Sequence, residues 1–146
     1  MREHMGLYRG KHPNGMWVYG SLATFRNIKN EPYTAIIPVE DGENQIRKLT
    51  RVDPATVGEC TTRKDKNGKL IFEGDIVKSV FNQRPYLVCF GEYTYCDEYG
   101  DELSACGFYS KDAYASATDF GSPEEWAIVI GNIHDNPELM EIEVCL

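Results

Sequence analysis

Short apolar runs broken by turn residues fill the chain, and the clearest series lies near its middle. Leu70–Phe72 form one run, Glu73–Asp75 interrupt it, and Ile76–Val77 resume it. The dipeptide Asn67-Gly68 precedes the series and predicts a type I′ turn, because both central residues of that turn need positive φ. The pattern therefore predicts two short strands that pivot on a Gly-Asp turn.

The first part of the chain predicts a β-hairpin over residues 7–24. Leu7–Lys11 and Met16–Leu22 are the expected strands, and Asn14-Gly15 is the turn between them. Trp17 and Tyr19 share one face of the second strand, since side chains alternate along a strand. An isolated hairpin is marginal in water, so these two aromatic residues need a partner surface, either the rest of the chain or a second subunit.

Further short runs predict more strands, and polar or proline-containing stretches separate them. The expected strands are 33–37, 57–61, 86–90, 107–109 and 126–130. Of these, 86–90 is the most apolar and is expected at the centre of its sheet, with Phe90 in the core. The expected loops and turns are 25–32, 40–44, 53–56 and 82–85, and residues 91–105 are either a loop or a ribbon.

Two short stretches carry helix signals. Ser122–Glu125 combines a cap residue, a proline and two acids, but the β-like run that starts at Trp126 follows at once, and we favour a strand there. Asn136–Met140 predicts a single helical turn. With about eight to ten short strands and no long helix, the fold class is mainly β. Residues 57–146 fit a small SH3-like barrel, and residues 1–56 a β-rich N-terminal extension.

Composition agrees with an ordinary globular domain. The chain has 146 residues, of which 42% are hydrophobic, so it is long enough to bury a core. No apolar run approaches the roughly 20 residues that span a membrane, and the first residues lack the apolar core of a signal peptide. We therefore expect a cytoplasmic protein.

The five cysteines do not suggest a zinc site. They are odd in number, and no Cys-x-x-Cys pair occurs among Cys60, Cys89, Cys96, Cys106 and Cys145. Cys60 and Cys89 lie in strand-like runs, where a cysteine usually acts as a small buried apolar residue.

Charge is uneven along the chain. Residues 1–57 carry eight Lys/Arg and six Asp/Glu, whereas residues 58–146 carry seven and seventeen, and the net charge is −8. An acidic C-terminal part repels a phosphate backbone, which disfavours nucleic-acid binding. The one basic cluster flanks the Asn-Gly turn and consists of Arg63, Lys64, Lys66 and Lys69.

The acidic stretch Glu92–Glu102 holds five carboxylates and three tyrosines without a base. Its spacing is not that of an EF-hand, so a solvated turn between strands is favoured over a Ca²⁺ or Mg²⁺ site. A contact surface for a polar partner is the other alternative.

No catalytic constellation is visible in the sequence. Glu73 and Asp75 flank a turn glycine, where carboxylates usually accept backbone amides. His134 has no readable nucleophile partner, and Gly-rich phosphate-binding loops are absent. We expect a protein that is not an enzyme and uses no cofactor.

Three stretches resemble the YopX family of phage and prophage proteins. They are residues 56–77, residues 129–139 and, more weakly, residues 9–22. The resemblance implies a phage or prophage origin in bacteria, an SH3-like barrel and a tendency to self-associate. It implies no activity and no site residues. The chain departs from the family at Thr62, where glycine is usual, and in the acidic segment near 92–102.

The hypothesis from the sequence is a non-catalytic accessory protein that forms a homo-oligomer and binds a host or phage protein. Trp17 and Tyr19 are the candidate contact residues. The alternative is a nucleic-acid-binding module that uses the basic turn at Arg63–Lys69. No membrane contact is expected.

Overall fold

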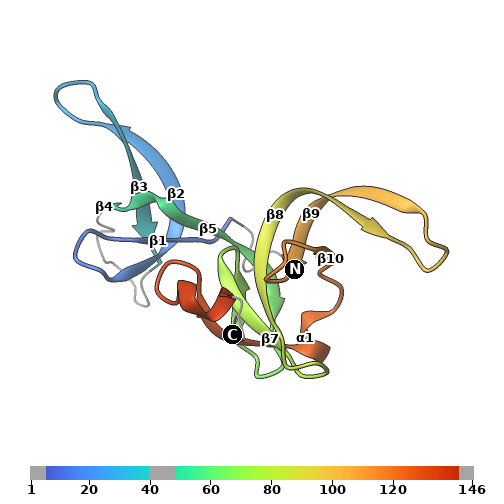
Figure 1. The fold of residues 1–146 in the computed structure, drawn as a ribbon. Helices are drawn as coiled ribbons and strands as arrows, with labels where there is room; N and C mark the ends of the chain where they lie inside the picture. Colours follow the sequence, from blue (N-terminus) through green and yellow to red (C-terminus); the bar gives the residue numbers. More distant parts are fainter. Residues whose placement is uncertain (1–5, 40–48, 142–146) are drawn as a thin grey trace. The chain divides into compact units, whose positions relative to one another are not determined.

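The computed structural model describes residues 6–39 and 49–141, which are mainly β. The chain divides into two compact units, Met1–Cys60 and Thr61–Leu146, and the boundary falls inside one long strand (Figure 1). The domain limits predicted at 56/57 stay a prediction. The expected loop at 40–44 and Cys145 lie outside the described residues.

One antiparallel sheet has the strand order β4-β3-β2-β1-β5-β6. Its strands are β1 (Tyr8–Lys11), β2 (Trp17–Arg26), β3 (Pro32–Pro38), β4 (Thr50–Arg51), β5 (Asp53–Lys64) and β6 (Leu70–Phe72). The predicted hairpin is confirmed, since Tyr8 pairs with Gly20 and Lys11 with Trp17.

The core of the first unit forms around Ile36 and Val52, which are 0% and 2% exposed. Gly10 lies against both: a Cβ atom there would approach Val52 Cγ2 to 2.8 Å. The absence of a side chain at Gly10 lets β1 pack closely on this core.

The second sheet has the order β10-β9-β8-β7-β11. Its strands are β7 (Asp75–Ser79), β8 (Pro85–Cys96), β9 (Glu102–Lys111), β10 (Ala117–Asp119) and β11 (Ala127–Asn132). The prediction that residues 86–90 lie at the centre of a sheet is confirmed. The core residues are Ile71, Val77, Val88, Phe120 and Ala127. Within the described residues the strands form no closed barrel.

Five hairpin turns share one geometry. In each, the amide of the first residue donates to the carbonyl four residues later, and the fourth residue has positive φ. The turns are His12–Met16, Asn27–Glu31, Asp65–Lys69, Asp97–Asp101 and Asp112–Ser116. The turns predicted at Asn14-Gly15 and Asn67-Gly68 are both present, but the type I′ geometry predicted at Asn67-Gly68 is wrong. Only the glycine of each pair has positive φ, as in a three-residue hairpin loop.

Two predicted loops are replaced by strand, the one at 25–32 only at its ends and the one at 53–56 throughout. β2 continues to Arg26 and turns at Asn27–Glu31, because β3 pairs with it as far as Pro32. The turn predicted at 53–56 is the start of β5, although Asp53 Oδ1 does accept the Ala55 amide at 3.0 Å as local turn chemistry requires. Strand pairing across the sheet overrides the proline signal in both places.

The stretch after residue 120 contains both elements that the sequence suggested. α1 (Pro123–Trp126) is a single turn, and β11 follows directly. The strand prediction is thus right for 127–130 and wrong for Trp126. η1 (Pro137–Met140) confirms the single helical turn predicted at Asn136–Met140.

Residues 91–105 form a ribbon of β8 and β9, which confirms one of the two alternatives. The prediction that Phe90 lies in the core is wrong, because 50% of this side chain is exposed where the ribbon leaves the sheet. Cys60 is buried as expected, Cys89 is half-buried, and Cys96 and Cys106 are exposed. No helix in the described ranges is long and apolar enough to cross a bilayer.

Candidate binding site

A pocket of about 310 Å³ opens in the second unit beside α1. Its wall is made of three aromatic residues and four small polar ones: Ser79, Phe81, Tyr86, Ser110, Thr118, Asp119 and Trp126. These residues come from β7, β8, β9 and β10, from the β7–β8 turn and from α1. A pocket of this size and mixed lining suits one or two side chains of a ligand.

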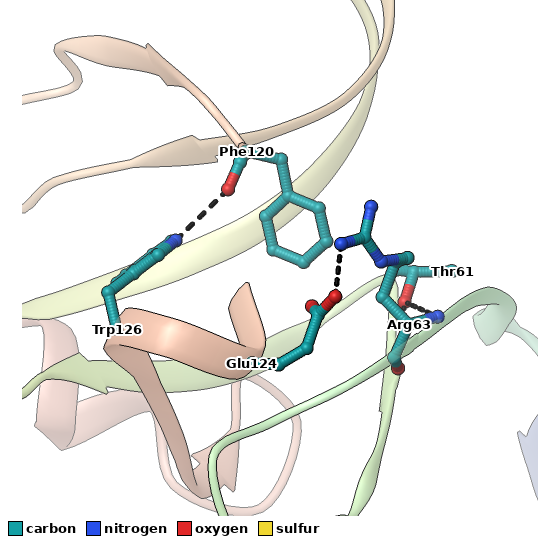
Figure 2. Close-up of polar contacts among 5 residues, drawn as sticks. All are labelled: Thr61, Arg63, Phe120, Glu124 and Trp126. Atoms are coloured by element: carbon teal, nitrogen blue, oxygen red, sulfur yellow. Dashed lines mark hydrogen bonds and ion pairs between the residues drawn. The ribbon is translucent and has the colours of Figure 1, made fainter. Parts of the chain in front are cut away.

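Trp126 lines the pocket from the last position of the short helix α1. Its indole Nε1 donates a hydrogen bond of 3.1 Å to the carbonyl of Phe120 (Figure 2). Its ring meets Tyr86 edge-on at 5.7 Å and Phe120 edge-on at 6.4 Å. Edge-to-face packing of this kind holds aromatic rings in fixed orientations, so the aromatic wall is preformed.

Phe81 is the most exposed part of the wall. It lies in the turn between β7 and β8, where Ser79 Oγ accepts its amide at 3.2 Å and Gln83 adopts a φ of 62°. On the other side of the turn, Asn82 Nδ2 donates to the Tyr86 hydroxyl at 2.8 Å. These bonds close the turn and leave 80% of Phe81 in solvent.

Polar groups complete the lining of the pocket. Ser110 is buried, and its hydroxyl donates to the Thr118 carbonyl at 3.4 Å. Asp119 is exposed and also interacts with Tyr93. Burial raises the pKa of the Tyr93 hydroxyl, and the nearby Asp119 carboxylate raises it further. The pocket thus combines an apolar wall with one carboxylate at its edge.

Arg63 and Glu124 form an ion pair beside the helix (Figure 2). The hydrogen bond from Arg63 lowers the pKa of the Glu124 carboxyl below its ordinary value. The Arg63 amide donates to Thr61 Oγ1 at 3.2 Å, which helps to orient the strand end. The charge of Arg63 is therefore partly neutralised by Glu124, which makes Arg63 less available to an anionic ligand.

The other predicted basic residues surround a buried carboxylate. Lys64, Lys66 and Lys69 are exposed, whereas Asp65, the first residue of the Asp65–Lys69 turn, is 3% exposed. The four basic residues thus lie at the end of β5 and in the turn that follows it. Arg63 forms an ion pair with Glu124.

Trp17 and Tyr19 belong to the first unit. The Arg9 guanidinium carbon lies 4.8 Å from the Trp17 ring centroid, and Lys11 Nζ lies at 5.9 Å. Such cation–π contacts engage Trp17 within its own sheet. Tyr19 is 44% exposed, so of the two candidate contact residues it is the more accessible.

The acidic segment is built around Asp97. Its Oδ1 accepts the amides of Tyr99 and Asp101, both at 2.9 Å. This carboxylate closes the β8–β9 turn as Asp65 closes its own. Among the described residues, no three His, Cys, Asp or Glu side chains gather as metal ligands would.

Sequence reasoning missed most of the pocket. Phe81 and Trp126 are 45 positions apart in the chain, and only the pairing of β7 with β8 and β11 brings them to one wall. The one local signal was Phe81 itself, a large aromatic residue at the start of the polar stretch Asn82–Arg84.

Comparison with known proteins agrees with the resemblance noted in the sequence. No match is found among curated proteins. The family model described as "YopX protein" matches residues 7–141, which is nearly the whole chain. The chain belongs to the YopX protein family.

Proposed function

We propose that this chain is a non-catalytic phage or prophage accessory protein that binds another protein of the phage or host. The partner places an anchor side chain in the pocket beside Trp126. The observation that supports this most directly is the exposed Phe81 next to a preformed aromatic wall. A role in the bacterial cytoplasm and an SH3-like arrangement of the second unit belong to the same proposal.

The lining of the pocket favours a particular kind of anchor. Phe81, Tyr86 and Trp126 offer apolar surface, which suits an aliphatic or proline side chain. Asp119 at the edge favours a Lys or Arg near the anchor in the partner's sequence. The net charge of −10 over residues 58–146 favours a basic partner segment in the same way.

Affinity capture with matched variants tests the pocket. Phe81→Glu places a charge in the aromatic wall with little effect on folding, because the side chain is exposed. Tyr114→Glu is the control, since Tyr114 is 72% exposed and does not line the pocket. We expect a protein that the wild type and Tyr114→Glu both retain from lysogenic cells, and that Phe81→Glu loses. Equal retention by all three chains would remove the pocket from the proposal.

Self-association is a second candidate, supported by the surface of the first unit. Val39 donates its amide to the Tyr19 carbonyl at 3.0 Å, so the two residues are neighbours across β2 and β3. Tyr19 is 44% exposed and Val39 is 59% exposed. A second copy that covers this patch would bury both side chains.

Light scattering at high protein concentration tests self-association. We expect a mass above the 16.6 kDa of one chain, and a return to that mass for Tyr19→Lys. The control is Thr24→Lys, which adds the same charge at an exposed position on the opposite face of β2. A wild-type mass of one chain at every concentration contradicts the homo-oligomer.

A further inference from the structure

The ribbon of β8 and β9 has two open backbone edges. The two strands pair with each other from Leu87↔Lys111 to Cys96↔Glu102. β7 pairs with β8 only at residues 85–87, and β10 pairs with β9 only at residues 109–111. Among the described residues, 89–96 and 102–108 therefore pair only within the ribbon, which runs on beyond its neighbours in Figure 1.

The two faces of this ribbon differ in chemistry. Strand alternation and the observed register place Glu92 and Glu102 on one face, and both are exposed. The opposite face carries Tyr93, Tyr95 and Leu103. The Tyr93 and Tyr95 rings lie 5.7 Å apart, and Leu103 is 40% exposed. One face is therefore acidic and the other is aromatic and apolar.

An open two-stranded ribbon is unusual, because unpaired strand edges invite further pairing. Common protections are a lysine or a proline on the edge, and residues 89–108 contain neither. They carry five carboxylates and no basic residue. Those charges repel the same ribbon of a second copy and repel nucleic-acid phosphates, but they attract a basic chain.

We propose that the β8–β9 ribbon docks an extended basic segment of a partner protein by strand addition. The segment pairs its backbone with an open edge. On the acidic face its Lys or Arg side chains neighbour Glu92 when it adds to β8 or Glu102 when it adds to β9, and its alternate, apolar side chains neighbour Tyr93 or Leu103 on the other face. The partner sequence is thus an alternation of basic and apolar residues. None of these ribbon residues lines the pocket beside Trp126, although Tyr93 interacts with Asp119 at the edge of that pocket.

Calorimetry with designed peptides tests strand addition on the full chain. The probe is a nine-residue peptide of alternating lysine and valine. The control peptide has the same sequence with every backbone amide N-methylated, which keeps its charge and side chains but removes its donors. We expect binding of the probe and a loss of at least about tenfold in affinity for the methylated peptide. Equal affinity for both, or no binding of the probe, overturns the proposal.

Two double variants test where the probe binds. Glu92→Gln with Glu102→Gln is expected to weaken binding about fivefold or more, since one of the two carboxylates neighbours the added strand at either edge and both charge the same face. Glu125→Gln with Glu138→Gln removes the same charge from exposed sites off the ribbon and is expected to change affinity less than twofold. Equal weakening by both pairs shows attraction by net charge alone and overturns the ribbon site.

Hydrogen exchange identifies the edge. The probe is expected to slow amide exchange within 89–96 or within 102–108, because the added strand takes up one row of open amides. Protection outside the ribbon overturns the proposal. Phe81→Glu is expected to leave probe binding unchanged, so the ribbon and the pocket are tested independently.

Discussion

Asp65 shows how one side chain ties a local turn to the rest of its unit. Its Oδ1 accepts the amides of Asn67 and Lys69, both at 2.9 Å. Its Oδ2 accepts the Val129 amide of β11, also at 2.9 Å. The turn that organises the middle of the sequence is therefore also a clamp on the last strand.

Replacing Asp65 by alanine removes the acceptor of three part-buried amides. We expect a loss of about 2–4 kcal/mol in the free energy of unfolding. Asp97→Ala is the matched control: it removes the same cap from the exposed β8–β9 turn and is expected to cost about 1 kcal/mol or less. Urea unfolding followed by Trp126 fluorescence in a Trp17→Phe background measures both. Equal losses would show that the bond to Val129 contributes nothing.

Thr62 carries a backbone conformation that suits glycine. Its φ is 65°, which is costly for a β-branched residue, and glycine is the usual residue at this position in the family that the sequence resembles. We expect Thr62→Gly to stabilise the chain by about 0.5–1 kcal/mol, net of the entropy that glycine loses on folding. Thr94→Gly, at an ordinary exposed strand position, is expected to destabilise it. Thermal unfolding of both variants tests the assignment, and a destabilised Thr62→Gly contradicts it.

The Arg63–Glu124 pair predicts a pH dependence of stability. Since the pKa of Glu124 is lowered in the folded chain, its contribution is present above the ordinary glutamate pKa and is lost as the pH falls through the folded value. Both side chains are more than 40% exposed, so the contribution is below about 1 kcal/mol. A carbon-13 NMR titration is expected to show a higher Glu124 pKa in Arg63→Gln. An unchanged titration contradicts the pairing.

At the scale of elements, the backbones of β2 and β3 leave no room for a side chain at Gly20. A Cβ atom there would lie 1.9 Å from the Ile37 carbonyl oxygen, which is backbone and cannot rotate away. We expect Gly20→Ala to destabilise the first unit by about 2–4 kcal/mol, because the strands must separate. Trp17 fluorescence during urea unfolding measures the change, and Ser21→Ala on the same strand is the control. A cost as small as that of the control would show that β3 moves freely.

Local sequence predicted the elements whose cause is local. The single turn at Pro137 and the reversal at Gly74-Asp75 follow from proline, glycine and carboxylate chemistry within a few residues, and Asp75 Oδ2 does accept the Phe72 amide at 2.8 Å. The prediction that Phe90 lies in the core was wrong for the opposite reason. Its exposure depends on where β7 stops pairing with β8, which no short window of sequence contains. The pocket could not be predicted from the sequence for the same reason, because strand pairing between distant segments brings its residues together.

At the scale of the whole molecule, the charge distribution favours protein binding over nucleic-acid binding. The net charge of −8 and the engagement of Arg63 by Glu124 leave Lys64, Lys66 and Lys69 as the exposed cations of the basic turn. Three lysines in and next to one turn give few phosphate contacts. Each contact weakens as salt is added, because the release of counterions then gains less free energy.

We therefore expect no binding of a 30-base-pair DNA duplex or a single strand of equal length at about 150 mM salt, where exposed charges are screened beyond roughly 8 Å. Fluorescence anisotropy with labelled DNA and RNA measures this. Binding that falls steeply with salt and disappears in Lys64→Glu with Lys66→Glu would contradict the expectation and establish the basic turn as the site. Binding that survives those substitutions would place the nucleic acid elsewhere on the chain. If the proposed binding of a basic protein segment is correct, added salt is expected to weaken it, because salt screens the attraction between the acidic chain and that segment.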